Sequence, residues 1–214
     1  MEYKAIIFDF DYTLGDCTDG IVACVEYALL NMKCKMQPIE KIREAVGMTL
    51  EDTYTYLMDD DKMEQREEFT RLFKIKADDV MCLSAIFLPY AEEILKELHR
   101  RNILVGIVTT KYRFRIVDIL EKLDAAGLVD AIIGSDNVAV AKPDPEGLKQ
   151  IIHNFGLEKQ QVLYVGDSYI DAQTAENAGV DFAGVTTGTT TKETFGNYKS
   201  ILIMEDLRPI LTMI

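Results

Sequence analysis

The chain has 214 residues, 48% of them hydrophobic, which suits one domain with a substantial insertion, or two small domains, around a real core. Its 23 basic and 36 acidic residues give a net charge of −13, which argues against binding nucleic acid or an anionic membrane through a general positive field. No apolar run approaches the ~20 residues that span a bilayer, and no signal-peptide core follows Met1, so we expect a cytoplasmic protein.

The cysteine and histidine residues offer little chemistry. The four cysteines are irregularly spaced and form no C-x-x-C pair, so buried reduced thiols are expected and a zinc site is not. Both histidines, His99 and His153, fall late in helix-like segments, where a solvated or capping role is the ordinary explanation. Proton transfer in an enzyme of this composition would therefore fall mainly to carboxylates.

The first predicted strand, residues 5–9, is apolar and ends in acidic residues. Asp9 and Asp11 lie at its carboxyl end, where open α/β sheets place their ligands. Two carboxylates two residues apart point the same way on an extended strand and repel each other unless a cation or a shared proton relieves the charge. The pair predicts a metal site with one acid as nucleophile and one as general acid and base, although a helix cap or turn is the alternative.

No strand-like run appears from about Asp16 to about Met81, where several amphipathic helices follow one another. Thr49 is predicted to cap one of them, and Asp59-Asp60-Asp61 is expected to be a solvated turn, with an acidic metal cluster as the alternative. A block this long is better explained by an inserted helical domain than by a loop. We therefore predict a core domain formed by residues 1–15 and 82–214 and an all-helical cap domain formed by residues 16–81.

The remainder of the chain alternates short β-rich runs with helical patterns. After the first strand, the runs are 104–109, 131–134, 162–165, 182–185 and 201–204. This alternation predicts an α/β fold with a Rossmann-like, mostly parallel sheet flanked by helices. The threonine-rich segment 186–191, after the fifth strand, is expected to be a surface loop, with a role in shaping the substrate site as the alternative.

Two of these later segments carry polar candidates. Thr109 ends the run at 104–109 and Thr110 follows it, before a helix whose N–H groups can hold phosphate, although a cap would also explain Thr109. Lys142 precedes two prolines that fix the backbone and start a helix at about Pro145. A rigidly held ammonium is the compact charge that an acidic protein needs beside a phosphate, and a solvated lysine is the alternative.

The run at 162–165 repeats the design of the first strand. Gly166 permits a sharp turn, and Asp167 and Asp171 follow at the carboxyl end. Asp167 can reach a hard cation near Asp9, because Mg²⁺ takes oxygen ligands. Asp171 faces the same way and is able to orient a ligand, the waters of the metal or Lys142, while a first-turn acid favoured by the helix dipole is the alternative.

The ordered set of two acids, a hydroxyl, a lysine and two acids resembles the haloacid dehalogenase-like (HAD) superfamily across essentially the whole chain. The matching motifs are Asp9-Phe10-Asp11-Tyr12-Thr13, Thr109, Lys142 and Gly166-Asp167-Ser168-x-x-Asp171. The inserted block is similar to the cap of phosphoglycolate phosphatase-like members. The family usually has glycine where Tyr12 stands, so a phenol is expected to crowd the pocket or to reach the substrate.

The resemblance implies a phosphatase that acts on a small-molecule phosphate ester. Asp9 would form an aspartyl-phosphate, Asp11 would be the acid and base, and Thr109 and Lys142 would hold the phosphate oxygens. Mg²⁺ would be held by the set Asp9, Asp11, Asp167 and Asp171, with Asp11 using its backbone carbonyl. Further substrate contacts are expected from Thr13, Thr110, Gly47 and Arg43.

Other functions compatible with these residues are distinguished by Asp11 and the insertion. Dehalogenases of the family lack an acid two positions after the nucleophile, because a halide leaves without a proton. A phosphosugar mutase of the β-phosphoglucomutase kind shares the core motifs and stays an alternative, as does a non-enzymatic, phospho-accepting receiver-like domain. The expected protein binds no nucleic acid and no membrane, and it is a monomer or a homodimer.

Overall fold

The computed structural model describes residues 3–214, so Met1 and Glu2, the start of the predicted segment 1–15, lie outside it. The chain divides into two compact units. Unit 1 comprises Met1–Asp16 and Phe87–Ile214, and unit 2 comprises Cys17–Ile86. Among the described residues, none of the helices combines the length and the apolar character that crossing a bilayer requires.

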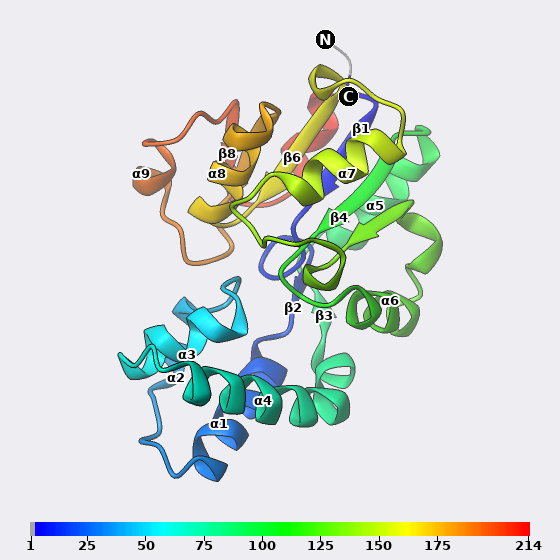
Figure 1. Cartoon of the computed structure of the whole chain (residues 1–214). Helices are drawn as coiled ribbons and strands as arrows, with labels where there is room; N and C mark the ends of the chain where they lie inside the picture. Colours follow the sequence, from blue (N-terminus) through cyan, green and yellow to red (C-terminus); the bar gives the residue numbers. More distant parts are fainter. Residues whose placement is uncertain (1–2) are drawn as a thin grey trace. The chain divides into compact units, whose positions relative to one another are not determined.

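Unit 1 is built on a six-stranded parallel sheet with the strand order β5-β4-β1-β6-β7-β8 (Figure 1). The strands are β1 (Ala5–Phe8), β4 (Leu104–Val108), β5 (Ala131–Ile133), β6 (Val162–Gly166), β7 (Asp181–Val185) and β8 (Leu202–Met204). All six predicted strands and the mostly parallel sheet are confirmed. A second, two-stranded sheet is formed by β2 (Gly15–Asp16) and β3 (Ile86–Phe87).

Helices join the strands of the large sheet. They are α5 (Ala91–Arg100), α6 (Arg113–Lys122), α7 (Glu146–Asn154), α8 (Tyr169–Ala178) and the short α9 (Lys192–Phe195). In α7, Leu148 and Ile151 are buried in one core cluster with Ile7 of β1 and Tyr164 of β6. Each fully buried aliphatic side chain of this kind contributes about 1.5–3 kcal/mol, so the sheet and its helices form a rigid frame for the strand ends.

Unit 2 is helical, with α1 (Thr18–Asn31), α2 (Ile39–Glu44), α3 (Leu50–Met58) and α4 (Met63–Ser84). Thr49 caps α3 as predicted, because its hydroxyl accepts a hydrogen bond from the backbone N–H of Asp52 at 3.1 Å. Inside the unit, the rings of Tyr54 and Phe69 pack with their centroids 5.5 Å apart. That unit 2 acts as a cap over a substrate stays a prediction.

Candidate active site

Three of the predicted site residues follow directly after three neighbouring strands. Asp9 follows β1, Thr109 follows β4 and Asp167 follows β6, and β1 lies between the other two in the sheet. The carboxyl ends of parallel strands meet at one edge, so these side chains are brought together. All three are buried, with at most 4% of each residue exposed.

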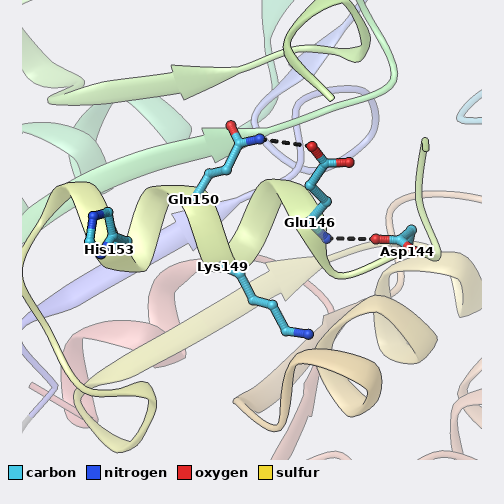
Figure 2. A pocket seen from close by; sticks show the side chains of 5 residues that line it. All are labelled: Asp144, Glu146, Lys149, Gln150 and His153. Carbon is cyan, nitrogen blue, oxygen red and sulfur yellow. Dashed lines mark hydrogen bonds between the residues drawn. The ribbon is translucent and has the colours of Figure 1, made fainter. Parts of the chain in front are cut away.

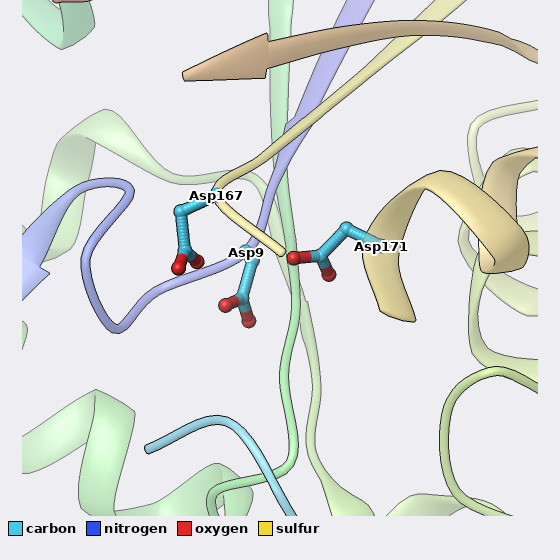
Figure 3. Close-up of side chains that lie close together, drawn as sticks. All are labelled: Asp9, Asp167 and Asp171. Atoms are coloured by element: carbon cyan, nitrogen blue, oxygen red, sulfur yellow. The ribbon is translucent and has the colours of Figure 1, made fainter. Parts of the chain in front are cut away.

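The carboxylates of Asp9, Asp167 and Asp171 form a compact acidic cluster (Figure 3). One oxygen from each lies within 4.8 Å of the others. Burial raises the pKa of Asp9 to about 7 and that of Asp167 well above its usual range, and the mutual repulsion of the acids adds to both shifts. Negative charge on these buried carboxylates is therefore favourable only when a positive charge lies beside them.

This donor set fits a hard divalent cation, which takes carboxylate oxygens and offsets both burial and repulsion. Elsewhere in residues 3–214, no other three acidic, histidine or cysteine side chains come together in this way. The alternative of a cluster at Asp59-Asp60-Asp61 therefore has no geometric support. The acidic cluster is the candidate metal centre of the chain.

Lys142 lies against this cluster. Its Nζ donates to Oδ1 of Asp9 at 2.8 Å and to Oδ1 of Asp171 at 2.7 Å, and its side chain is only 5% exposed. Burial by itself would lower the pKa of Lys142, but the carboxylates of Asp171 and Asp9 outweigh it and raise the pKa above the usual range. Lys142 thus stays charged and partly neutralises the acids.

Asp171 is held by donors from the chain itself. Besides Lys142, its Oδ1 accepts from the hydroxyl of Tyr164 at 2.8 Å. Its Oδ2 accepts from the backbone N–H of Ser168 at 3.1 Å and from the hydroxyl of Ser168 at 2.5 Å. Such saturation makes Asp171 a fixed anchor for the ammonium of Lys142.

Gly166 lies close behind this anchor. A Cβ added at Gly166 would lie 2.4 Å from Cβ of Asp171, which is closer than two non-bonded carbon atoms can approach. The sequence predicts a glycine that permits a turn, and the structure adds a second reason, since the missing side chain leaves room for Asp171.

Asp11 is buried but does not join the acidic cluster through its side chain. Its Oδ2 accepts a hydrogen bond from Nζ of Lys111, a residue that the sequence analysis did not single out. Within residues 3–214, no donor reaches the buried Oδ1 of Asp11. The two acids of the first motif therefore have different surroundings, one beside the candidate metal centre and one in an ion pair.

The turn after β1 accounts for the unusual Tyr12. Its φ of 57° lies in the left-handed region, where glycine is the favoured residue, which gives a physical reason for the expectation of glycine at this position. The next residue, Thr13, donates its hydroxyl to Oδ1 of Asp167 at 3.3 Å. Thr13, expected as a substrate contact, is thus engaged with an acid of the cluster.

Residues 186–191 form a loop after β7, as predicted, and part of this loop packs against the site. Thr187 donates its hydroxyl to the backbone carbonyl of Tyr12, and buried Thr190 accepts from the backbone N–H of Tyr169 at 3.0 Å. Gly188 comes so close that an added Cβ would lie 1.8 Å from Oδ2 of Asp167. A threonine-rich composition is also typical of a solvated loop, so composition alone does not reveal this packing.

The remaining predicted contacts lie in two places. Thr110 follows Thr109 after β4 and is half-buried. Arg43 is exposed on α2 of unit 2, and Gly47 follows that helix with a φ of 94°. The contribution of these three residues to substrate binding stays a prediction.

A pocket of about 480 Å³ lies along α7 and is lined by Asp144, Glu146, Lys149, Gln150 and His153 (Figure 2). Polar groups of this pocket make hydrogen bonds within α7 and at its N-terminal end. Gln150 donates to Glu146 at 3.0 Å, and the backbone N–H of Glu146 donates to Asp144 at 2.9 Å. It contains none of the strand-end acids, so the site at the sheet edge is the better candidate for chemistry.

Comparison with known proteins agrees with this arrangement. The family model described as haloacid dehalogenase-like hydrolase matches residues 6–185. Phosphoglycolate phosphatase from Salmonella typhimurium is 29% identical over 206 residues, with 86% of this chain and 82% of that protein covered.

Solved structures give the same result. A haloacid dehalogenase-like hydrolase from Bacteroides fragilis has a TM-score of 0.94 and 37% identity, and the match covers 98% of this chain and 100% of that chain. A haloacid dehalogenase-like family protein from Streptococcus pneumoniae, 23% identical, shares the fold with a TM-score of 0.88 over 98% of this chain and 97% of its own. Together with the sheet and the strand-end residues of this chain, these matches show that the chain belongs to the haloacid dehalogenase-like hydrolase family.

Proposed function

We propose that the protein is a Mg²⁺-dependent phosphatase that hydrolyses a small phosphomonoester through an aspartyl-phosphate on Asp9. The observation that carries the proposal is the ammonium of Lys142, held within hydrogen-bond distance of both Asp9 and Asp171 in a buried acidic cluster. A buried carboxylate beside a fixed cation is suited to attack on phosphorus, because the charge of the phosphoryl group needs compensation.

In this mechanism the chain supplies the nucleophile and the proton carrier. An oxygen of Asp9 forms a bond to phosphorus while the bond from phosphorus to the ester oxygen breaks, and the carboxyl group of Asp11 gives its proton to the leaving oxygen. The carboxylate of Asp11 then takes a proton from water as that water attacks phosphorus. This second step releases phosphate, restores the Asp9 carboxylate and returns the proton to Asp11.

The other residues position these groups. Lys142 and the hydroxyl of Thr109 would hold oxygens of the phosphoryl group, and Asp171 keeps Lys142 in place. Asp9 and Asp167 would hold the Mg²⁺ ion, with Asp171 near it. When bound, this ion supplies positive charge to the phosphate and to the acids.

The name of a relative supports a proposal for the substrate class. The relative from Salmonella typhimurium is named phosphoglycolate phosphatase, and the match spans most of both chains. We propose a small phosphomonoester of the phosphoglycolate type, which carries a carboxylate. Arg43 of unit 2 offers a cation for such a group, and its exposure leaves it available to solvent and solutes.

The test is hydrolysis of 4-nitrophenyl phosphate and of 2-phosphoglycolate with Mg²⁺ in excess. Asp9→Asn should lower kcat by at least about 10³-fold, because the nucleophile is lost. Asp11→Asn should lower kcat by at least about 100-fold, because the proton carrier is lost. The exposed Asp61 provides the matched control, and Asp61→Asn should keep the activity of the parent protein.

A trapped covalent adduct distinguishes this mechanism from direct attack by water. Acid quenching during turnover, followed by proteolysis and mass spectrometry, should find phosphate on the peptide that contains Asp9. Unchanged turnover in the Asp9→Asn protein would exclude the proposal.

A further inference from the structure

We propose that Lys111 is a positioning residue for Asp11, fixing one carboxylate oxygen so that the other exchanges the proton with the leaving group. This inference rests on the proposed function, because it assigns a role within the same reaction. It begins with the hydrogen bond from Nζ of Lys111 to Oδ2 of Asp11. The Lys111 side chain is 10% exposed and the Asp11 side chain 6%, so the ion pair is shielded from solvent.

The backbone of Lys111 is fixed on two sides. Its N–H donates to the hydroxyl of Thr109 at 3.2 Å, and its carbonyl accepts from the backbone N–H of Ser135 at 2.9 Å. Thr109 directly follows β4, and Ser135 lies shortly after β5. The ammonium therefore projects from a segment that two strands of the sheet hold in place.

The carboxylate of Asp11 starts from a backbone that is equally constrained. The carbonyl of Phe10 accepts hydrogen bonds from the N–H groups of Leu14 and Gly15, both at 2.9 Å, which closes the turn around Asp11. A long lysine side chain from one fixed segment and a short aspartate from another thus meet at one carboxylate oxygen. The pairing leaves the orientation of the carboxylate little freedom.

The second observation is the state of Oδ1. This oxygen of Asp11 is buried, and within the described chain it has no hydrogen-bond partner. Buried polar atoms without a partner are rare in folded proteins and call for an explanation. A substrate oxygen that needs a proton is the partner we assign to it.

The path of the proton shows how the contact between Lys111 and Asp11 would act in the reaction. When the bond from phosphorus to the ester oxygen breaks, the proton on Oδ1 moves to that oxygen, and Asp11 becomes a carboxylate. Lys111 already donates to Oδ2, so the new negative charge forms beside a fixed ammonium. When water attacks in the second step, the proton returns to Oδ1, and the contact of Lys111 with Oδ2 is kept.

The experiment uses two aryl phosphates of nearly equal shape, 4-nitrophenyl phosphate and phenyl phosphate. Phenolate is the more basic leaving group and needs the proton more. In Lys111→Met, which keeps the length of the side chain and removes its charge, kcat for phenyl phosphate should fall at least about tenfold more than kcat for 4-nitrophenyl phosphate. Lys111→Arg keeps a charged donor and should restore the ratio to within about threefold of the parent protein.

A double variant separates positioning from other roles. Asp11→Asn should show the same leaving-group bias, and adding Lys111→Met to it should cause little further loss, because the two residues act in one step. A loss in Lys111→Met that is equal for both esters, or losses that add in the double variant, would overturn the inference and indicate that Lys111 only binds phosphate or supports the fold. Lys149 is an exposed lysine on α7, and Lys149→Met should leave both rates unchanged.

The outcomes also separate this inference from the proposed function. A parent protein without phosphatase activity overturns both. A parent protein that is active, with a leaving-group bias in Asp11→Asn but none in folded Lys111→Met, overturns the role of Lys111 alone. Circular dichroism of each variant reports whether it is folded, and Lys111→Gln, which also removes the charge, carries the same test if the methionine variant does not fold.

Discussion

Gly188, which has no side chain, helps to determine how the acidic cluster is arranged. Gly188 lies so close to Asp167 that even a methyl group has no room, since its Cβ would lie 1.8 Å from Oδ2. Such an approach limits where the carboxylate of Asp167 can point. Thr13 donates to the other oxygen of the same carboxylate at 3.3 Å. The orientation of the Asp167 carboxylate in the acidic cluster is therefore determined by its neighbours.

Substitution Gly188→Ala tests this constraint. The added methyl group must displace either the loop or Asp167, so we expect phosphatase activity to fall about 10- to 100-fold and half-saturation with Mg²⁺ to need more metal. Measurement of kcat across a Mg²⁺ series checks both effects. Gly127→Ala is the matched control, because nothing lies within 4 Å of a Cβ at that position. Equal behaviour of the two variants would contradict the argument.

At the scale of elements, the sequence predicts the strands well and the loops poorly. The apolar runs that became β1 and β6 are buried along their whole length, and burial of this kind leaves a strong pattern in the sequence. Lys111 and Gly188 lie in loops, where composition does not reveal a partner distant in the chain. Their contacts with Asp11 and Asp167 exist only once the strands are side by side.

The cap of α3 gives a prediction at this scale. Thr49→Ala removes the acceptor for the N–H of Asp52, and we expect the free energy of unfolding of unit 2 to fall by about 1 kcal/mol. Urea denaturation followed by circular dichroism measures the change. Thr49→Ser keeps the hydroxyl and should lose less than half as much. A loss of the same size in both variants would show that the methyl group of Thr49, and not its hydroxyl, stabilises the helix.

For the molecule as a whole, the proposed metal site in the buried acidic cluster would link metal binding to stability. A cation that binds only the folded chain raises the free energy of unfolding, by about 2.7 kcal/mol at a concentration 100 times its Kd. We therefore expect Mg²⁺ to raise the unfolding midpoint in urea and EDTA to reverse that rise. Activity should be lost and recovered in parallel.

Variants of the cluster identify the site responsible. Asp167→Asn should reduce or abolish the Mg²⁺-dependent rise, because one of the proposed ligands loses its charge, whereas the exposed Asp61→Asn should retain it. An undiminished rise in Asp167→Asn would mean that Mg²⁺ stabilises the protein from another position.

The strand order has a consequence for how the molecule is made. β1 comes from the beginning of the chain, yet it pairs Ala5 with Leu104 on one side and with Val162 on the other. During synthesis, β1 leaves the ribosome well before β4 and β6, so it can pair with both of these strands only after they have been made. Fragments that stop before β6 lack one of the two strands beside β1 and also lack Asp167, so we expect no catalysis from a product truncated before this strand.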